Sequence, residues 1–185
     1  METNCFVKPS KRPVAWREIK LLLLDCDGVL TDGRIIYGQQ GQELKHFSAR
    51  DGMGFMLLKY TDVIAGIITG RSSEALQRRC NDLHIEHLHQ GVRNKLHCID
   101  ELLATLHLDY KNVVYMGDDW NDVPVMRKVA FSATPADAHA DMHKIADWVT
   151  PHNGGHGAAR DLIDHILMHK GIYEKTVKQY IEEIS

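Results

Sequence analysis

Short apolar runs of strand length recur along this chain, and glycine or polar residues follow each of them. Residues 21–24 are four leucines, and residues 63–68 and 112–116 are further runs rich in aliphatic and β-branched side chains. Residues 96–106 and 123–128 have instead the apolar spacing of helices. Strands that alternate with helices predict an α/β fold with a Rossmann-like, doubly wound parallel sheet.

The first apolar run places two carboxylates on a loop closed by glycine. Asp25 and Asp27 follow Leu24, and the loop continues as Gly28-Val29-Leu30-Thr31-Asp32-Gly33. Two like charges this close repel unless a cation or a shared proton offsets them, so the loop indicates a metal site, an acid/base site, or both. An EF-hand calcium loop does not fit, because its twelfth position requires Glu where this chain has Ile36. From the loop alone, a polar surface turn is the alternative.

Other predicted elements also begin or end in polar side chains. The second run is followed by Thr69-Gly70-Arg71, Lys95 opens the helical segment 96–106, and the run 112–116 leads into Gly117-Asp118-Asp119. Because the carboxyl ends of parallel strands meet at one edge of a sheet, we expect these groups to face a common crevice. Carboxylates for magnesium, a hydroxyl with backbone donors, and a lysine are the groups that phosphate chemistry needs.

In this order, the motifs resemble those of haloacid dehalogenase-type phosphatases from about residue 21 to residue 167. Within that superfamily the chain is similar to the 3-deoxy-D-manno-octulosonate (KDO) 8-phosphate phosphatase family. The segments that carry this resemblance are Asp27 to Gly33, Arg50-Asp51-Gly52, Ile67 to Ser72, Gln90-Gly91, Met116 to Asp119, Pro124-Val125-Met126 and Gly154 to Arg160.

The resemblance implies a magnesium-dependent phosphatase that converts KDO 8-phosphate to KDO and phosphate, a step in the synthesis of lipopolysaccharide precursors. It implies that Asp25 is the nucleophile that forms an aspartyl-phosphate, and that Asp27 is the general acid and base. Thr69 and Lys95 would bind the phosphoryl oxygens. The implied magnesium ligands are the Asp25 carboxylate, the Asp27 backbone carbonyl and Asp118.

Further residues have supporting or substrate-binding roles by resemblance. Gly70, Asp119 and Asp122 would support the site, Asp122 by orienting Lys95; for Asp119 an interaction with a helix dipole is the alternative. The residues implied for the sugar acid are Asp27, Ser48, Ala49, Arg50, Asp51, Gly52, Arg71, Arg79 and Lys95. An arginine fork suits a carboxylate, although Arg79 also fits a solvated helix face.

The spacing of the motifs excludes a large lid domain. Forty-four residues separate Asp25 from Thr69, and twenty-three separate Lys95 from Asp118, and both gaps must also hold parts of the sheet and its helices. The first gap has room for a β-hairpin flap at about 33–48. A lone hairpin is marginally stable, so we expect it to contact a partner surface. The resemblance implies a homotetramer assembled through this flap, in which a neighbour partly covers each active site.

Length and composition limit the remaining possibilities. A chain of 185 residues with 44% hydrophobic content suits one domain, predicted at 19–170 between an N-terminal arm at 1–18 and a C-terminal helical tail at 171–185. The net charge of −3 gives no support for a nucleic-acid partner. No apolar run has membrane-spanning length and no signal-peptide pattern is present, so we expect no membrane partner and a cytoplasmic location.

Three alternatives follow from the same residues. A zinc site at His84, His87 and His89 is disfavoured, because a strand through this segment would place His84 on the opposite face. A phosphatase of a nine-carbon keto sugar acid 9-phosphate would share all the motifs. A non-catalytic scaffold or regulatory subunit of the same fold is the alternative from another class, although it would have no reason to retain clustered charge.

Overall fold

A six-stranded parallel sheet forms the centre of the molecule. The computed structural model describes residues 13–185, and in it the strand order is β5-β4-β1-β6-β7-β8. The strands are β1 (Leu21–Leu24), β4 (Ile64–Ile68), β5 (His87–His89), β6 (Val113–Met116), β7 (Phe131–Thr134) and β8 (Trp148–Val149). Every neighbouring pair in this sheet is parallel. The predicted α/β fold with a doubly wound parallel sheet is confirmed.

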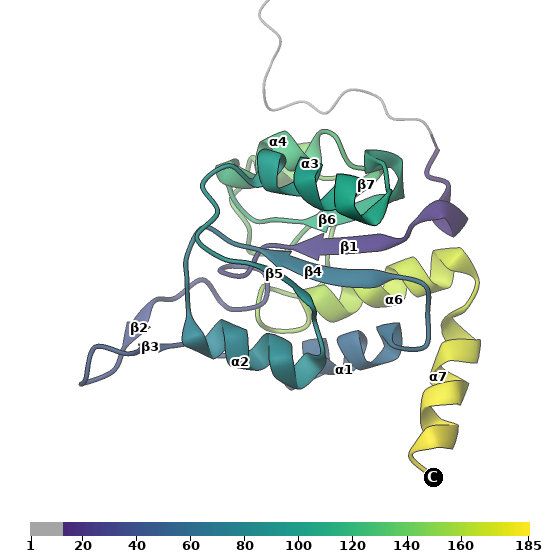
Figure 1. Cartoon of the computed structure of the whole chain (residues 1–185), viewed down its shortest axis with the longest axis horizontal. Coiled ribbons are helices and arrows are strands. Elements are labelled where there is room, and N and C mark those ends of the chain that lie inside the picture. Colours follow the sequence, from purple (N-terminus) through teal and green to yellow (C-terminus); the bar gives the residue numbers. More distant parts are fainter. Residues whose placement is uncertain (1–12) are drawn as a thin grey trace, which may run out of the picture.

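Helices cover both faces of the sheet (Figure 1). One face carries α1 (Ala49–Leu58), α2 (Glu74–Leu83) and α6 (Ala158–Lys170), and the other carries α3 (Lys95–Leu106), α4 (Val123–Met126) and α5 (Met142–Ile145). Short 3-10 helices lie in the connections: η1 (Trp16–Glu18), η2 (Tyr110–Asn112) and η3 (Trp120–Asp122).

Strand β1 is apolar at every position because the sheet buries both of its faces. Leu22 and Leu24 belong to the hydrophobic core beside α1, α2 and α6, whereas Leu21 and Leu23 belong to the core beside α3, α4 and α5. Side chains alternate along a strand, so a four-leucine run is what a central strand with two covered faces requires.

The register of β1 brings three strand ends together. Leu24 lies opposite Ile67 of β4 on one side and opposite Met116 of β6 on the other. The backbone N–H of Asp25 donates to the Met116 carbonyl at 3.0 Å, which extends the pairing by one residue. The polar segments after these three strands therefore start side by side.

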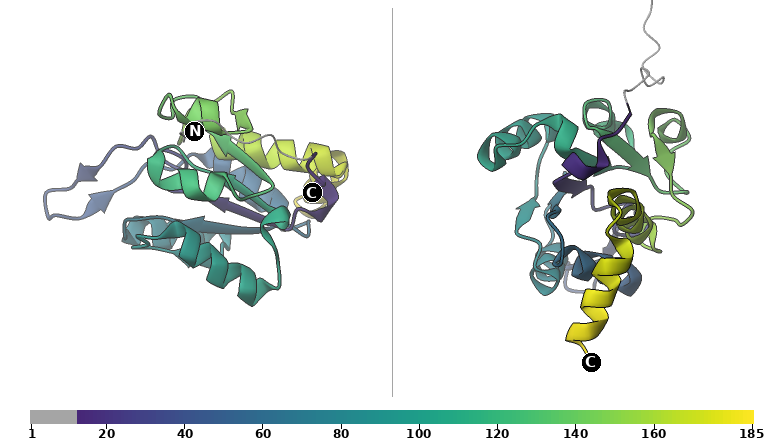
Figure 2. Two further views of the ribbon diagram at one scale, coloured as in Figure 1. Left: turned by 90° about the horizontal axis from the view of Figure 1, so that it is seen from above. Right: turned by 90° about the vertical axis from the view of Figure 1, so that its right-hand side faces the viewer.

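The predicted flap is a separate two-stranded hairpin, β2 (Ile36–Tyr37) and β3 (Glu43–Leu44). It projects from the body on the side to which the carboxyl end of β1 points (Figures 1 and 2). Tyr37 is 67% exposed. The gap between Asp25 and Thr69 holds only this flap, α1 and β4, and the gap between Lys95 and Asp118 holds α3, η2 and β6. The prediction of a fold without a cap domain agrees with this arrangement.

The two ends of the described chain pack against the domain. Residues 1–12 of the predicted arm lie outside the described residues, but Trp16 contacts Phe131, with ring centroids 4.8 Å apart. The arm predicted at 1–18 therefore joins the core before residue 18. The predicted tail contains α7 (Tyr173–Glu183), whose Glu183 accepts a 2.7 Å hydrogen bond from the Tyr60 hydroxyl. Between residues 13 and 185, no helix combines the length and the apolar character needed to cross a membrane.

Candidate active site

The loop after β1 presents Asp25 to a buried lysine. One Asp25 oxygen accepts a 2.7 Å hydrogen bond from the Cys26 backbone N–H, and the other pairs with Lys95 Nζ at 2.6 Å. Burial and the nearby charge of Asp122 raise the pKa of Asp25 to about 6, although Lys95 opposes this shift. The carboxylate is thus held in place by two donors while it faces uncompensated negative charge.

Lys95 stands between two carboxylates at the start of α3. Its Nζ also lies 2.6 Å from Asp122 Oδ1, and the side chain is 3% exposed. Asp122 in turn accepts a hydrogen bond from the Tyr115 hydroxyl at Oδ1 and from the Asp118 backbone N–H at Oδ2, the latter at 3.0 Å. Asp122 therefore fixes the lysine and the loop after β6 at once.

Asp118 follows β6 and completes a cluster of acidic side chains. Asp25, Asp118 and Asp122 each offer one carboxylate oxygen, and these atoms lie within 4.8 Å of one another. Burial, followed by the charges of Asp122 and Asp25, raises the pKa of Asp118 to about 8. Gly28, with φ +84°, allows this approach, because a Cβ at that position would overlap the Asp118 carboxylate.

The donor set of this cluster fits a divalent cation. Three carboxylates face a single lysine, so the charge of the site is unbalanced, and the raised pKa of Asp118 reports that imbalance. Magnesium prefers carboxylate oxygens and needs only one or two from the protein. Asp25 and Asp118 line the pocket at this edge of the sheet, whereas Asp122 is fully buried and serves Lys95, Tyr115 and the backbone, so Asp25 and Asp118 are the side chains placed to hold an ion. Among residues 13–185 this is the one group of three or more possible metal ligands, and the histidines at 84, 87 and 89 form none.

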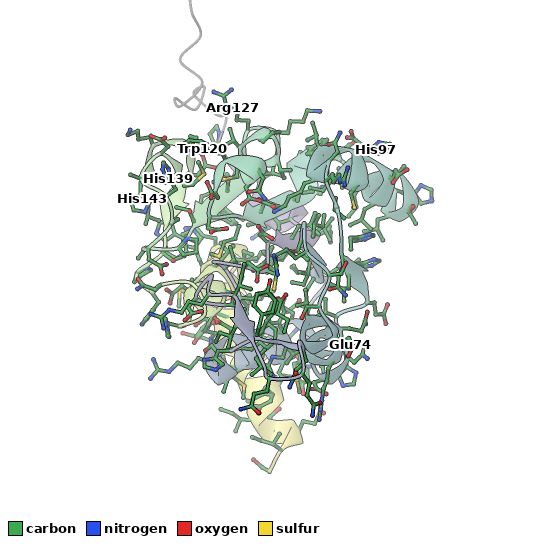
Figure 3. The ribbon with its side chains drawn as sticks, turned by 90° about the vertical axis from the view of Figure 1, so that its left-hand side faces the viewer. Glu74, His97, Trp120, Arg127, His139 and His143 are labelled. Carbon is green, nitrogen blue, oxygen red and sulfur yellow. The ribbon has the colours of Figure 1, made fainter. Side chains whose placement is uncertain are left out.

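A pocket of about 410 Å³ opens at this edge of the sheet. Seven of the predicted site residues line it: Asp25, Asp27, Thr69, Gly70, Arg71, Asp118 and Asp119. Asp119 also caps η3, accepting a 2.7 Å hydrogen bond from the Trp120 N–H. Trp120 is a lining residue that the sequence analysis did not identify. Its ring lies 5.2 Å from that of His139, and both are labelled in Figure 3.

The flap adds two residues that sequence reasoning missed. Lys45 forms ion pairs with Asp27 and with Glu43, the latter at 2.8 Å, and Glu43 holds Arg71 Nη2 at 2.7 Å. A signal for them exists in the sequence, because Glu43 and Lys45 are two residues apart on either side of apolar Leu44, a spacing that places two side chains on one face of an extended segment. The flap is therefore tied to the active site of its own chain.

The predicted sugar-acid segment lies outside this pocket in the single chain. Ser48 caps α1, accepting from the N–H groups of Arg50 and Asp51, and Asp51 accepts a 2.8 Å hydrogen bond from the Arg160 N–H. Arg79 donates to the Ser48 carbonyl at 3.0 Å, so the described chain uses this arginine to hold the base of the flap. Neither these residues nor Ala49 and Gly52 belong to the pocket lining.

Comparison with known proteins gives a consistent result. Residues 78–162 match the model of the haloacid dehalogenase-like hydrolase family. The 3-deoxy-D-manno-octulosonate 8-phosphate phosphatase KdsC of Escherichia coli (strain K12) is 43% identical over 179 residues, which cover 96% of this chain and 95% of that protein.

Solved structures agree in fold. The crystal structure of 3-deoxy-D-manno-octulosonate 8-phosphate phosphatase from Yersinia pestis superposes with a TM-score of 0.84 at 45% identity, over 86% of each chain. The enzyme of that name from Moraxella catarrhalis, in complex with a magnesium ion, a phosphate ion and a KDO molecule, has a TM-score of 0.86 at 34% identity, over 89% of this chain and 95% of that one. The chain therefore belongs to the haloacid dehalogenase-like hydrolases, and within them to the family of the 3-deoxy-D-manno-octulosonate 8-phosphate phosphatases.

Proposed function

We propose that this protein is a magnesium-dependent phosphatase that hydrolyses KDO 8-phosphate to KDO and inorganic phosphate, in the synthesis of lipopolysaccharide precursors. The observation that carries the proposal is the pairing of Lys95 with Asp25 beside Asp118, in a chain 43% identical to a phosphatase of that name. The complex of the Moraxella catarrhalis enzyme with magnesium, phosphate and KDO supports the same substrate class and cofactor.

In the first half-reaction, an oxygen of Asp25 attacks phosphorus. The bond from phosphorus to the sugar oxygen breaks, Asp27 gives its proton to that oxygen, and an aspartyl-phosphate forms. Lys95 and the Cys26 N–H hold Asp25 in the attacking position. Thr69, which is buried at the end of β4 and lines the pocket, supplies a hydroxyl for the phosphoryl oxygens.

In the second half-reaction, Asp27 removes a proton from a water molecule that attacks the phosphorylated Asp25. The bond from phosphorus to Asp25 breaks, which regenerates the carboxylate and releases phosphate. Lys95 stays beside Asp25 through both steps and balances part of the charge on the transferred group.

Magnesium would be held by the Asp25 and Asp118 carboxylates and the Asp27 backbone carbonyl, and when bound it supplies positive charge against two approaching anions. Gly70 and Asp119 support the pocket wall in this proposal, and Asp122 orients Lys95. Arg71, which lines the pocket and is held by Glu43, is placed to meet the sugar acid.

We also propose a homotetramer assembled through the flap. The exposed side chains Ile35, Tyr37 and Leu44 support this, because a monomer would leave all three in water. Residues 48–52 and Arg79 lie at the base of the flap, so a neighbour that docks there can bring them to the sugar acid of an adjacent site. The oligomeric state is measured by light scattering, and a fully active monomer would reject the tetramer.

We place the reaction in the cytoplasm. The buried free thiols of Cys26 and Cys80 support this, since a reducing compartment keeps thiols in that form. Fractionation of cells that produce the protein, followed by immunodetection, tests the location, and recovery from the cell envelope would contradict it.

The decisive test of the activity is phosphate release from KDO 8-phosphate and from a nine-carbon keto sugar acid 9-phosphate with magnesium present. We expect the eight-carbon substrate to have the higher kcat/KM. A preference for the nine-carbon substrate would change the substrate while retaining the chemistry. Absence of turnover with both would favour the non-catalytic scaffold.

A further inference from the structure

Lys45 reaches from the flap to Asp27, a residue that lines the active-site pocket. The flap is mostly exposed, yet the Lys45 side chain is 2% exposed, because it extends toward the loop after β1. A lysine is rarely buried without a partner, and here the partners are the carboxylates of Asp27 and Glu43. Burial opposes the charge of Lys45, but the two carboxylates outweigh it and raise the pKa of this lysine.

The two carboxylate oxygens of Asp27 differ in their partners. Lys45 Nζ donates to Oδ1. Oδ2 is buried without a hydrogen-bond partner, and Arg71 Nε, which also lacks one, lies 3.8 Å from it. Both residues line the pocket. A buried carboxylate oxygen without a donor is unfavourable, so this atom is suited to a partner that arrives with the substrate.

Four charged side chains form a closed ring around this point. Lys45 joins Asp27 to Glu43, Glu43 holds Arg71 at 2.7 Å, and Arg71 faces Asp27. The signs alternate, so the ring balances its own charge, unlike the cluster at Asp25. Two members come from the flap and two from the loops after β1 and β4, so the ring fixes the flap against the pocket.

We propose that Lys45 is a positioning residue for the general acid Asp27. Its Nζ donates to Asp27 Oδ1, so that Oδ2 is the oxygen that carries the proton in both half-reactions. In the acid form, Oδ1 accepts from Lys45 while Oδ2 gives its proton to the departing sugar oxygen as the bond from phosphorus to that oxygen breaks. In the base form, the same Oδ2 takes a proton from the water that attacks the aspartyl-phosphate. Without Lys45 the carboxyl group can rotate, and either oxygen can turn away from the substrate.

This inference rests on the proposed phosphatase activity, and leaving-group dependence tests it. An alkyl phosphate such as KDO 8-phosphate needs a proton on its departing oxygen, whereas p-nitrophenolate departs as a stable anion. The kcat/KM value reports the steps through the first transfer to Asp25, so it isolates the donation of that proton.

We expect Lys45→Met, with magnesium present, to lower kcat/KM for KDO 8-phosphate by between about 10-fold and about 100-fold. For p-nitrophenyl phosphate we expect a loss of less than about threefold, because little of its barrier depends on the acid. The loss for KDO 8-phosphate should lie in kcat, with KM unchanged and with an unchanged Kd for KDO in calorimetry. Lys45→Arg keeps a cationic donor and should recover most of that loss.

The matched control is Lys20→Met, which removes a lysine paired with Asp62 at the opposite end of β1. Lys20→Met should leave kcat/KM unchanged for both KDO 8-phosphate and p-nitrophenyl phosphate. Circular dichroism checks the fold of each variant, and Glu43→Gln, which weakens the hold on Lys45, gives a second test if Lys45→Met does not fold. Glu43→Gln should also lower kcat/KM more for KDO 8-phosphate than for p-nitrophenyl phosphate.

Equal losses of kcat/KM for both substrates would overturn the proposal, and Lys45 would then only hold the flap in place. A parallel rise in KM for KDO 8-phosphate and in Kd for KDO would also overturn it, because Lys45 would then contact the sugar acid. If kcat/KM is unchanged for both substrates, a role for Lys45 in the reaction is excluded. If the wild-type protein hydrolyses p-nitrophenyl phosphate but not KDO 8-phosphate, the proposed substrate fails instead, and the aryl substrate still reports whether Lys45→Met affects transfer to Asp25.

Discussion

Strand β1 carries an ion-pair cluster at each of its ends, and the two clusters differ in burial and in charge balance. At the amino end, Lys20 and Lys170 both pair with Asp62, which is 51% exposed. At the carboxyl end, Lys95 pairs with Asp25 and Asp122, and all three side chains are buried. The first cluster has two cations for one carboxylate, whereas the second, with Asp118, has one cation for three.

The pKa shifts of the two clusters have opposite signs. Burial works against the charge of Asp62, but hydrogen bonds from Lys20 and Lys170 outweigh it and lower the pKa of this carboxyl. At the other end, burial and like charges raise the pKa of Asp118 to about 8. At the amino end the one carboxylate thus has cations of the protein as its partners, while the three carboxylates at the carboxyl end require a further cation. This difference separates a structural cluster from a functional one.

The largest difference should appear when one carboxylate is replaced at each end of β1. Asp25→Asn removes the proposed nucleophile, so we expect kcat for phosphate release from KDO 8-phosphate to fall by a factor of about 10⁴ or more. Asp62→Asn is the matched control and should leave kcat unchanged. Retained activity in Asp25→Asn would reject the nucleophile assignment.

Removal of metal should affect only the carboxyl end. Treatment with a chelator followed by its removal should lower kcat by about 10³-fold, because the carboxylates would then repel the phosphate. Added magnesium should restore the rate, and added sodium at equal ionic strength should not. An unchanged rate in the metal-free protein would disprove the cation site.

Removing the lysine from each cluster should show the difference in stability. Lys95→Met leaves Asp25 and Asp122 buried without their cation, so we expect the free energy of unfolding to fall by about 3–5 kcal/mol. Lys20→Met breaks an exposed pair and should cost less than about 1 kcal/mol. Urea unfolding of the two variants measures both values, and similar losses would show that burial does not distinguish the clusters.

The smallest effect concerns pH. In the metal-free protein the pKa of folded Asp118 is about 8, above the unfolded value of 3.8, so the folded state binds more protons between these pH values. The free energy of unfolding therefore contains a term that is fully present below about pH 4 and is lost as the pH rises toward 8. A bound cation removes this loss by favouring the ionised carboxylate. The increase in Tm on adding magnesium should thus be larger at pH 8.5 than at pH 6, and the reverse order in a thermal scan would contradict the assignment.

Much of the site could be predicted because its residues follow strands. Asp25 and Thr69 come directly after an apolar run and Asp118 follows one after a single glycine, and in a parallel sheet such positions converge whatever the helices between them do. Lys95 was predicted from its position at the start of a helix and from the family resemblance. The structure places it between Asp25 and Asp122.

Other residues depended on contacts that no local pattern specifies. Arg79 holds the Ser48 carbonyl, where the sequence offered either a substrate ligand or a solvated helix face. Trp16 packs against the core, although its neighbours in the sequence indicate an arm. In each case the partner lies at least 31 residues away along the chain, so the side chain's role was decided by packing between distant segments.

The sequence by itself determined the class of fold, the order of the strand ends and the kinds of groups that meet there. The reason is that apolar periodicity specifies elements, and parallel pairing specifies where their ends lie. Only the tertiary structure decided which charges balance one another: Asp62 with two lysines, Asp118 with none of its own, and Lys45 reaching from the flap to Asp27. Charge balance depends on distance and burial in three dimensions, and both are set after the elements pack.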